Sequence, residues 1–254
     1  MDETVQEEIA AKYSEELERA RELMDLTFSR GAASTDAAED RVVFPLLVSC
    51  RDIIEEILFA IRDGFGRAAL RATRTMCECL VIARHLNLHP EKTEDFLNLF
   101  YIEWAKVYQD IPEVERDAGM EAEIRAHVPR YAQGKRVRTT ELEWSGNHVY
   151  EMAKEAGSLA ELHSLVFTLA SAYIHPGAVL YLSSLSTSEQ EESVVKISEK
   201  TQDAEARHAL RGAHDLLLNA VDLRLKYAPS SAIDDLFCQC KDDFLRIWGY
   251  QPHI

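Results

Sequence analysis

Positive charge is scarce in this chain, and the shortage bears on the partners that it can bind. The 254 residues include 28 lysines and arginines against 44 aspartates and glutamates, which gives a formal net charge of -16. Binding to nucleic acid or to an anionic membrane surface needs clustered lysine and arginine side chains. The overall charge therefore argues against nucleic acid as a partner, although a local basic patch would escape this argument.

Long apolar runs are also missing. A membrane-spanning helix needs roughly 18 or more consecutive apolar residues. The best candidate stretch, residues 162–186, is interrupted by His163, His175 and Pro176. Residues 1–20 are acidic and helical in pattern, without the apolar segment of a secretion signal. We therefore expect no membrane partner and a cytoplasmic location.

Cysteine is too sparse to suggest a disulfide framework. The chain has five cysteines, and this odd number without an export signal predicts reduced thiols. Cys77 with Cys79 and Cys238 with Cys240 form two C-x-C pairs, but both pairs fall in predicted helices. Side chains two residues apart on a helix point about 200° apart, so such a pair cannot easily hold one ion. No H-E-x-x-H motif is present, and no E-x-x-H pair has a matching second helix. The sequence therefore predicts buried or half-buried thiols and gives no support for a metal ion or another cofactor.

Alternating strand patterns and hairpin turns are rare, whereas the helical period recurs along the chain. The segments with this period are residues 3–29, 34–64, 67–88, 91–111, 112–132, 158–175, 201–228 and 231–248. No internal repeat and no inert linker divides them. The sequence therefore predicts an all-α fold, a single helical bundle of about eight helices that forms one domain over residues 1–254.

Both ends of the predicted domain are helical. Residues 1–30 carry one apolar stripe along an amphipathic helix, which would pack on the chain's own core or on a second copy to give a homodimer. Residues 201–248 form a pair of helices separated by Pro229. Pro45, early in the 34–64 segment, should kink or break that helix.

Polar side chains follow one face of the predicted helix at residues 67–88. Arg67, Arg71, Arg74, Glu78 and His85 are spaced so that they share a narrow stripe. One interpretation is a solvated charged face with an ordinary i,i+4 ion pair between Arg74 and Glu78. The alternative is a helix that lines a cleft and binds an anion, and periodicity alone favours the first interpretation.

The most apolar predicted helix ends in a polar pair. Ser171 and His175 lie one turn apart, and Pro176 pushes His175 out of the α region, so the helix should end there. His175 could simply cap the helix, because a helix C-terminus favours a protonated histidine. Alternatively, the two side chains face other polar groups across the bundle. A hydrolytic serine–histidine pair is the least favoured interpretation, because no strained elbow and no oxyanion donors are evident.

A basic cluster stands out against the acidic background. It consists of Arg125, Arg130, Lys135, Arg136 and Arg138, with no acidic residue inside it. A solvated loop is the default interpretation, and contact with the phosphate of a nucleotide or RNA is the alternative. The candidate anion-binding residues of the chain are Arg71, Arg136 and Arg138.

Three short motifs, in this order, resemble a known bacterial family. They are an R-x3-E helix core, RTMCE, at residues 74–78; a tryptophan-led segment, WSGNHVYEMAKEAG, at 144–157; and a helix ending in S-x3-H-P, SAYIHP, at 171–176. Over residues 67–183 the chain is similar to the family known as domain of unknown function 5677. Phe167 stands where this family often carries a tyrosine, a departure that weakens any phenol-based chemistry.

The resemblance implies an α-helical bundle with no established activity, and some relatives are suspected of roles in bacterial defence. It also groups Arg74, Glu78, Ser171 and His175 into one candidate site drawn from two helices. The first hypothesis that follows is a non-enzymatic accessory, regulatory or interaction module. In such a module these side chains form a buried network or meet a protein partner or an anionic ligand.

The second hypothesis is a ribonuclease or nucleotide-transfer toxin that resembles the HEPN (higher eukaryote and prokaryote nucleotide-binding) domains, which use an R-x4–6-H motif. That spacing occurs three times, at Arg84/His89, Arg207/His214 and Arg246/His253. With nineteen arginines and nine histidines in the chain, about two matches are expected by chance, so the motif is uninformative. Arg207 and His214 are the best of the three pairs, because they share a helix face. A hydrolase built on Ser171 and His175 ranks third.

Overall fold

Helices make up nearly all of the chain that the structure describes. The computed structural model describes residues 5–28, 40–137, 148–174, 185–187, 195–197, 203–227 and 229–254. The α-helices are α1 (Val5–Lys12), α2 (Ser14–Phe28), α3 (Asp40–Arg62), α4 (Gly66–Leu88), α5 (Thr93–Asp110), α6 (Ala118–His127), α7 (Pro129–Ala132), α8 (Val149–Glu155), α9 (Leu159–Ile174), α11 (Asp203–Tyr227) and α12 (Ser231–Trp248). Two 3-10 helices, η1 (Pro90–Lys92) and η2 (Glu113–Glu115), and one antiparallel pair of strands, β1 (Leu185–Thr187) and β2 (Val195–Ile197), accompany them. The predicted all-α fold is confirmed, and no helix in these ranges is long and apolar enough to cross a membrane.

In the described part of the chain, the number of helices exceeds the expected eight because two predicted segments are subdivided and one short helix lies outside the predicted segments. The N-terminal segment bends at Tyr13, which separates α1 from α2. The segment 112–132 contains η2, α6 and α7 rather than one helix, since Pro129 starts a new helix directly after α6. The short helix outside them is α8, whose seven residues are too few to show a helical period in the sequence.

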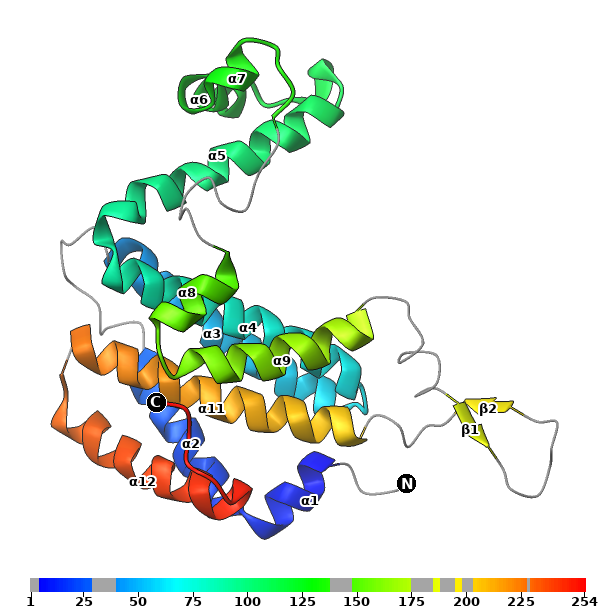
Figure 1. Cartoon of the computed structure of the whole chain (residues 1–254), viewed down its shortest axis with the longest axis vertical. Helices are drawn as coiled ribbons and strands as arrows, with labels where there is room; N and C mark the ends of the chain where they lie inside the picture. Colours follow the sequence, from blue (N-terminus) through cyan, green and yellow to red (C-terminus); the bar gives the residue numbers. More distant parts are fainter. Residues whose placement is uncertain are drawn as a thin grey trace.

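The centre of the bundle is formed by α3, α4, α9 and α11, which lie side by side (Figure 1). Gly64 connects α3 to α4 with a φ of +80°, a conformation that favours glycine, and it lets α4 run back along α3. Pro45 lies inside α3, which continues past it, so the helix does not break there. Pro45 is the sixth residue of α3, so it removes one intrahelical hydrogen bond and costs more than a proline in the first turn would.

The central helices α4 and α11 approach each other closely. Thr73 is fully buried, and its hydroxyl donates to the carbonyl oxygen of Ala69 in its own helix at 2.9 Å. The same hydroxyl lies 3.3 Å from the carbonyl oxygen of Ala209 across the interface. A Cβ atom on Gly212 would lie only 2.9 Å from Thr73 Cγ2, so this contact leaves no room for a side chain. Further along, Arg84 Nη2 donates to Asp222 Oδ2 at 2.9 Å and ties the same two helices together.

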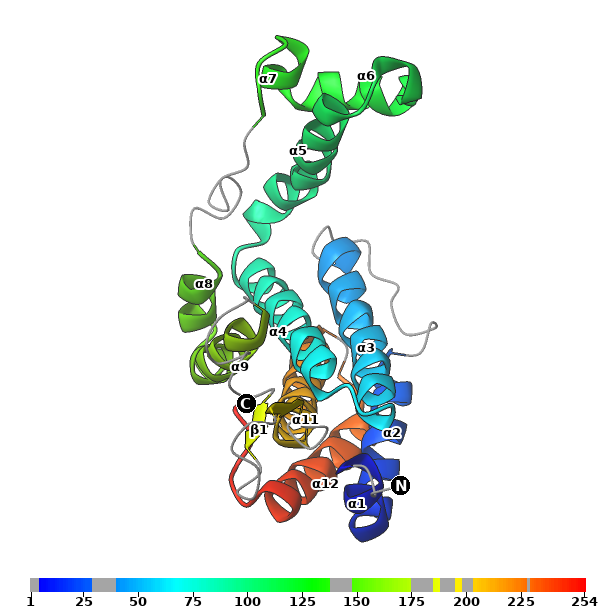
Figure 2. The ribbon, with the colours of Figure 1, turned by 90° about the vertical axis from the view of Figure 1, so that its right-hand side faces the viewer.

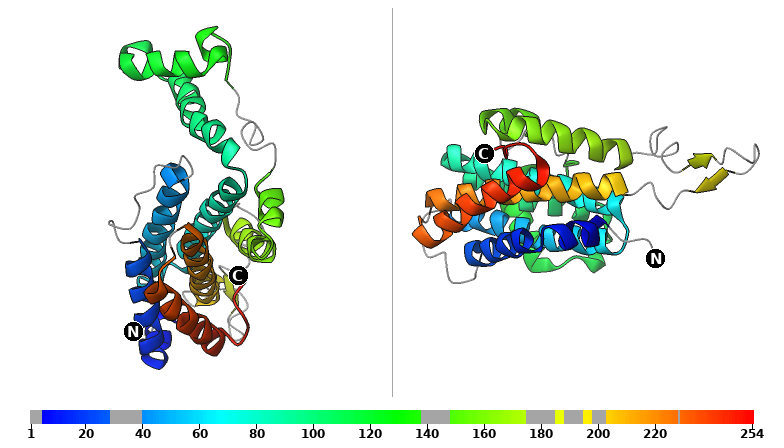
Figure 3. Two further views of the ribbon diagram at one scale, coloured as in Figure 1. Left: turned by 90° about the vertical axis from the view of Figure 1, so that its left-hand side faces the viewer. Right: turned by 90° about the horizontal axis from the view of Figure 1, so that it is seen from below.

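The N-terminal helices pack on the chain's own bundle. Ile9, Leu23 and Phe28 are each at most 3% exposed. Helix α2 lies beside α12, as the view from below shows (Figure 3). Between them, Arg19 Nε and Nη2 donate to the two carboxylate oxygens of Asp243 at 2.7 and 2.9 Å. Of the two alternatives for the N-terminal stripe, the structure shows packing on the chain's own core, and a homodimer stays a prediction.

Helix α5 leads away from the bundle and carries α6 and α7 at its far end (Figure 2). We call residues 93–137 the arm. The arm has its own apolar cluster, formed by Ala105, Tyr108, Ile124, Val128, Tyr131 and Val137. The end of the arm is held in place by Gln109 of α5. The Gln109 side chain donates to the carbonyl oxygen of Lys135 at 2.8 Å and accepts from the Val137 amide at 2.9 Å.

The C-terminal residues fold back onto the bundle. Gly249, with a φ of +78°, ends α12. The chain then reaches α11, where Asp215 is fully buried. Asp215 Oδ1 accepts from the His253 backbone amide at 2.9 Å, and Asp215 Oδ2 lies 2.6 Å from His253 Nδ1. The buried carboxylate thereby anchors the end of the chain.

Candidate functional site

A cavity of about 840 Å³ lies between α4, α5, α8 and α9. Its polar lining includes Arg74 and Glu78 from α4, Lys106 from α5 and His163 from α9, and aromatic rings are supplied by Tyr150 and Phe167. A volume of this size falls within the range of about 300–1,000 Å³ typical of small-molecule sites. The cavity is therefore the main candidate for a functional site among the described residues.

Arg74 is held from two helices at the edge of this cavity. Its Nε donates to Glu78 Oε1 at 2.9 Å, one turn along α4. Its Nη1 lies 3.4 Å from Ser171 Oγ on α9, and its guanidinium carbon lies 4.0 Å from the centre of the Phe167 ring. Phe167 and Ser171 are four residues apart on α9 and so present one face to α4. The structure therefore brings three of the four residues grouped at the sequence level into contact.

The remaining predicted residues either fall outside the described residues or do not line the cavity. His175 and Arg138 fall outside the described residues. Arg71 is exposed on α4, and Arg136 is exposed at the end of the arm. The polar stripe of α4 does not lie in solvent as a whole, because His85 is only 2% exposed.

His163 is a polar residue of the cavity that the sequence analysis treated only as a break in an apolar run. Its side chain is 4% exposed, and neither ring nitrogen has a hydrogen-bond partner among the described residues. The ring stacks on Phe167, with 5.2 Å between centroids, and lies 6.1 Å from the Tyr150 ring. Burial lowers the pKa of His163, and Arg74 lowers it further while Glu78 opposes the change. The ring is therefore a neutral imidazole that offers one donor and one acceptor.

The four-residue spacing of His163, Phe167 and Ser171 along α9 was a usable signal for this site. Combined with Arg74 and Glu78, one turn apart on α4, it describes two helix faces that carry polar and aromatic groups. What the sequence did not reveal is that the two faces meet.

The candidate nuclease residues Arg207 and His214 form hydrogen bonds with different residues and not with each other in the described part of the chain. Arg207 Nη2 donates to Glu8 on α1 at 2.9 Å, at the surface. His214 is 8% exposed, and its Nδ1 accepts from Trp248 Nε1 on α12 at 3.2 Å. Burial lowers the pKa of His214 to about 4, partly opposed by Asp243. The pair does not form a shared, accessible polar site in the described part of the chain.

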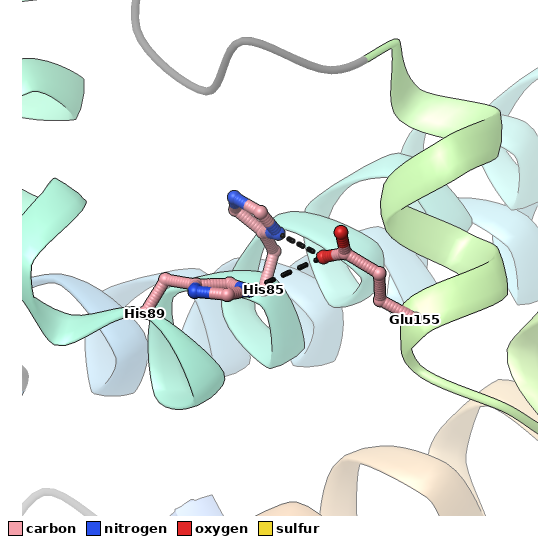
Figure 4. Close-up of side chains that lie close together, drawn as sticks. All are labelled: His85, His89 and Glu155. Atoms are coloured by element: carbon pink, nitrogen blue, oxygen red, sulfur yellow. Dashed lines mark hydrogen bonds and ion pairs between the residues drawn. The ribbon is translucent and has the colours of Figure 1, made fainter.

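A second polar cluster lies at the C-terminal ends of α4 and α8 (Figure 4). His85 Nδ1 and His89 Nε2 lie 3.0 and 3.3 Å from the same oxygen, Oε2 of Glu155. Nitrogen and oxygen atoms of these three residues lie close enough together to hold a metal ion. The sequence offered no support for a metal, because the usual metal motifs lie within one helix or in matching helices, whereas Glu155 comes from a short helix that is distant in the sequence.

The five cysteines are all free thiols, in different surroundings. Cys50, Cys77 and Cys240 are buried, Cys79 is half-buried, and Cys238 is exposed. Burial raises the pKa of Cys77 and of Cys240 to about 12. The surroundings of the four buried or half-buried cysteines suit packed, unreactive thiols, whereas the expected burial is wrong for Cys238, which is exposed on α12.

Comparison with known proteins gives one family. A family model described as "Family of unknown function (DUF5677)" matches residues 40–193, a range that includes α3, α4, the arm, α8 and α9. No curated protein and no solved structure matches the chain. The cavity and the histidine cluster both lie within the matched range.

Proposed function

The chain belongs to the family of unknown function DUF5677, and from this premise we propose that it is a regulatory module that binds a small, planar, polar molecule. The ligand would occupy the cavity between α4, α5, α8 and α9 and act on the conformation of α8 and the arm. The proposal assigns no reaction to the site. A link to bacterial defence stays a prediction of the family resemblance.

The observation that carries this proposal is the state of His163. A buried polar atom without a partner costs about 1–3 kcal/mol, and His163 presents two such atoms among the described residues. A purely structural polar network is tolerated when all its members are satisfied. Such a network would leave His163 unexplained, whereas a ligand with one donor and one acceptor would satisfy the ring once the side chains that cover its nitrogens move aside.

The rest of the lining indicates the class of ligand. Tyr150 and Phe167 contribute aromatic surface to the lining, against which a planar molecule can pack, although Arg74 and His163 already contact the Phe167 ring. The charges of the lining are balanced, because Arg74 pairs with Glu78 and Lys106 lies 2.5 Å from Glu103. A ligand with little net charge therefore fits better than a multiply charged phosphate. Heterocycles of the nucleobase type have this combination of flat faces and paired donor and acceptor atoms.

The nuclease alternative receives less support. A histidine that acts as a general acid or base needs a pKa near the working pH and contact with its substrate. Burial lowers the pKa of His214 to about 4, and the ring is 8% exposed. Helices α6 and α7, which carry Arg125 and Arg130, lie at the far end of the arm (Figure 1), whereas His214 belongs to α11 in the bundle.

The first test replaces His163 with phenylalanine. Because the ring nitrogens have no partner among the described residues, His163→Phe should leave the free energy of unfolding unchanged or raise it by about 1 kcal/mol. The same variant should lose ligand binding. Urea unfolding measures the first effect, and thermal-shift screening of nucleobases, nucleosides and aromatic amides, followed by calorimetry, measures the second.

Variants at the edge of the cavity complete the test. Thr168→Trp, at an exposed lining residue, should fill the cavity, and Phe167→Ala should weaken binding at least about tenfold by removing a stacking face. Phe59→Ala is the matched control, because Phe59 is also exposed with an arginine, Arg62, over its ring at 4.6 Å, but lies outside the cavity. The proposal fails if no compound of the panel binds. It also fails if the compounds that do bind are held equally well by Thr168→Trp and Phe167→Ala.

A further inference from the structure

The cluster of two histidines and a glutamate at the ends of α4 and α8 is separate from the cavity lining. We propose that His85, His89 and Glu155 form a binding site for a divalent transition-metal ion of the Zn²⁺ type. This site goes beyond the proposed ligand binding, and neither depends on the other.

The spacing of the donor atoms suits such an ion. Zinc bonds nitrogen and oxygen ligands at about 2.0–2.2 Å in a tetrahedral arrangement, so its ligand atoms lie about 3.3 Å apart. Glu155 Oε2 lies 3.0 Å from His85 Nδ1 and 3.3 Å from His89 Nε2. One carboxylate oxygen therefore already faces two imidazole nitrogens at nearly the distances that coordination requires (Figure 4).

Local structure explains why the two histidines converge. They are four residues apart, so an α-helix places them on one face, and their ring centroids lie 4.6 Å apart. Pro90 prevents the helix from continuing, and His89 leaves the helical conformation with a φ of -130° and a ψ of 65°. The end of α4 is thus a defined position rather than a frayed one, and the C-terminal end of α8 brings Glu155 to it.

A second carboxylate supports a metal rather than simple hydrogen bonds. Glu91 Oε1 lies 3.5 Å from His89 Nδ1, the nitrogen on the opposite side of the ring from Glu155. Metal-bound histidines commonly direct their second ring nitrogen toward a carboxylate in this way. If Nδ1 carries the proton of a neutral ring, Nε2 turns a lone pair toward the Glu155 oxygen. A cation between the two atoms converts that repulsion into two bonds.

The donor set also selects the class of ion. Two imidazole nitrogens and one carboxylate oxygen suit zinc and its neighbours in the first transition row, whereas Mg²⁺ and Ca²⁺ prefer oxygen alone. The side chains of His89 and Glu155 are each 38% exposed, which leaves the ion open to solvent and a fourth position for water. Bound metal would hold α8 against α4, one turn beyond the residues that line the cavity.

The test uses the full chain without a polyhistidine tag, stripped with a chelator and titrated with Zn²⁺ by calorimetry. We expect one equivalent of Zn²⁺ with a Kd of about 10 μM or tighter, a much weaker response to Mg²⁺, and binding at least about tenfold weaker in His89→Gln and in Glu155→Gln. Both residues are partly exposed, so these variants avoid the folding risk of replacing buried His85. X-ray absorption of the Zn²⁺ complex should show nitrogen and oxygen ligands only.

His127→Gln is the matched control. His127 has the same side-chain exposure of 38% and also lies beside a glutamate, with 3.8 Å between His127 Nδ1 and Glu123 Oε2. This variant should bind Zn²⁺ as the unmodified chain does. The proposal is overturned if equimolar binding is absent, or if both cluster variants bind normally. It is equally overturned if sulfur appears among the ligands or if Cys238→Ser abolishes binding.

Discussion

The buried histidine between α11 and α12 should make the stability of this protein sensitive to mild acid. His214 is 8% exposed, accepts a hydrogen bond from Trp248 Nε1 and lies 5.0 Å, between ring centroids, from Phe244. Burial lowers the pKa of His214 from its ordinary 6.5 to about 4, and the carboxylate of Asp243 opposes only part of that effect. In the folded protein the ring therefore stays neutral well below the pH at which a free histidine becomes charged.

The sign and size of the effect follow from proton linkage. Between pH 6.5 and about 4 the unfolded chain binds a proton at His214 that the folded chain does not, so stability is full above this window and falls as the pH drops through it. From about pH 7 to about pH 5.5 the loss is about 1 kcal/mol. The figure depends little on the folded pKa, because proton uptake by the unfolded chain dominates in this range. A lower limit of about pH 5.5 also keeps the protein above its pI of about 5.0, where precipitation is a risk.

The assay is urea unfolding followed by circular dichroism at both pH values, with His214→Asn as the variant. Asparagine keeps an acceptor for Trp248 and removes the titration, so the variant should lose about 1 kcal/mol less than the unmodified chain between the two pH values. His85 and His163, whose pKa values are also lowered by burial, act in the same direction in both proteins and cancel in the comparison. His208→Asn, at an exposed histidine of the same helix, is the control and should behave as the unmodified chain. Equal losses in His214→Asn and the unmodified chain would refute the reasoning.

Three further perturbations test packing, charge and thiol accessibility. Gly212→Ala should lower the free energy of unfolding, measured by urea unfolding, by about 1–2 kcal/mol, since the new methyl group would press on Thr73 Cγ2. Adding Thr73→Ser to this variant removes Cγ2 and should restore most of the lost stability. Asp243→Asn should cost about 1–3 kcal/mol in the same assay, because it removes the negative charge and one of the two carboxylate oxygens to which Arg19 donates, whereas Asp242→Asn, at the exposed neighbour, should be neutral. A thiol reagent should modify Cys238 rapidly in the folded protein and the three buried cysteines only after unfolding; fast reaction of four or five thiols would contradict the described burial.

Much of the fold could be predicted from the sequence because the long helices are amphipathic. Periodic apolar residues marked α3, α4, α5, α9, α11 and α12, and the glycines and prolines at their ends marked the connections. The separate position of the arm was harder to predict. Its helices bury a small apolar cluster of their own, but their apolar residues follow the same period as those of a bundle helix. Periodicity records which face of a helix is covered and not which element covers it.

Part of the candidate site could also be predicted, because helical spacing shows which residues share one face of a helix. The contact between Arg74 and Glu78 follows from their spacing on one helix, and the approach of Ser171 was anticipated from the resemblance to the family. The burial of His163 could not be deduced, because it depends on which helices enclose its ring. The approach of Glu155 to His85 depends in addition on the docking of a seven-residue helix that carries almost no sequence signal.

The two proposed sites lie on one helix face, and this arrangement has a physical consequence. Arg74, Glu78 and His85 on α4 and His89 at its C-terminal cap follow one another at intervals of four, seven and four residues, on the side that faces α8 and α9. A helix whose other sides already pack in the core has no structural need to cover this polar side. Covering it with α8 and α9 removes hydration from charged and imidazole groups, a cost that ordinary packing would avoid with apolar residues. The polar composition of this face therefore supports the two proposed sites.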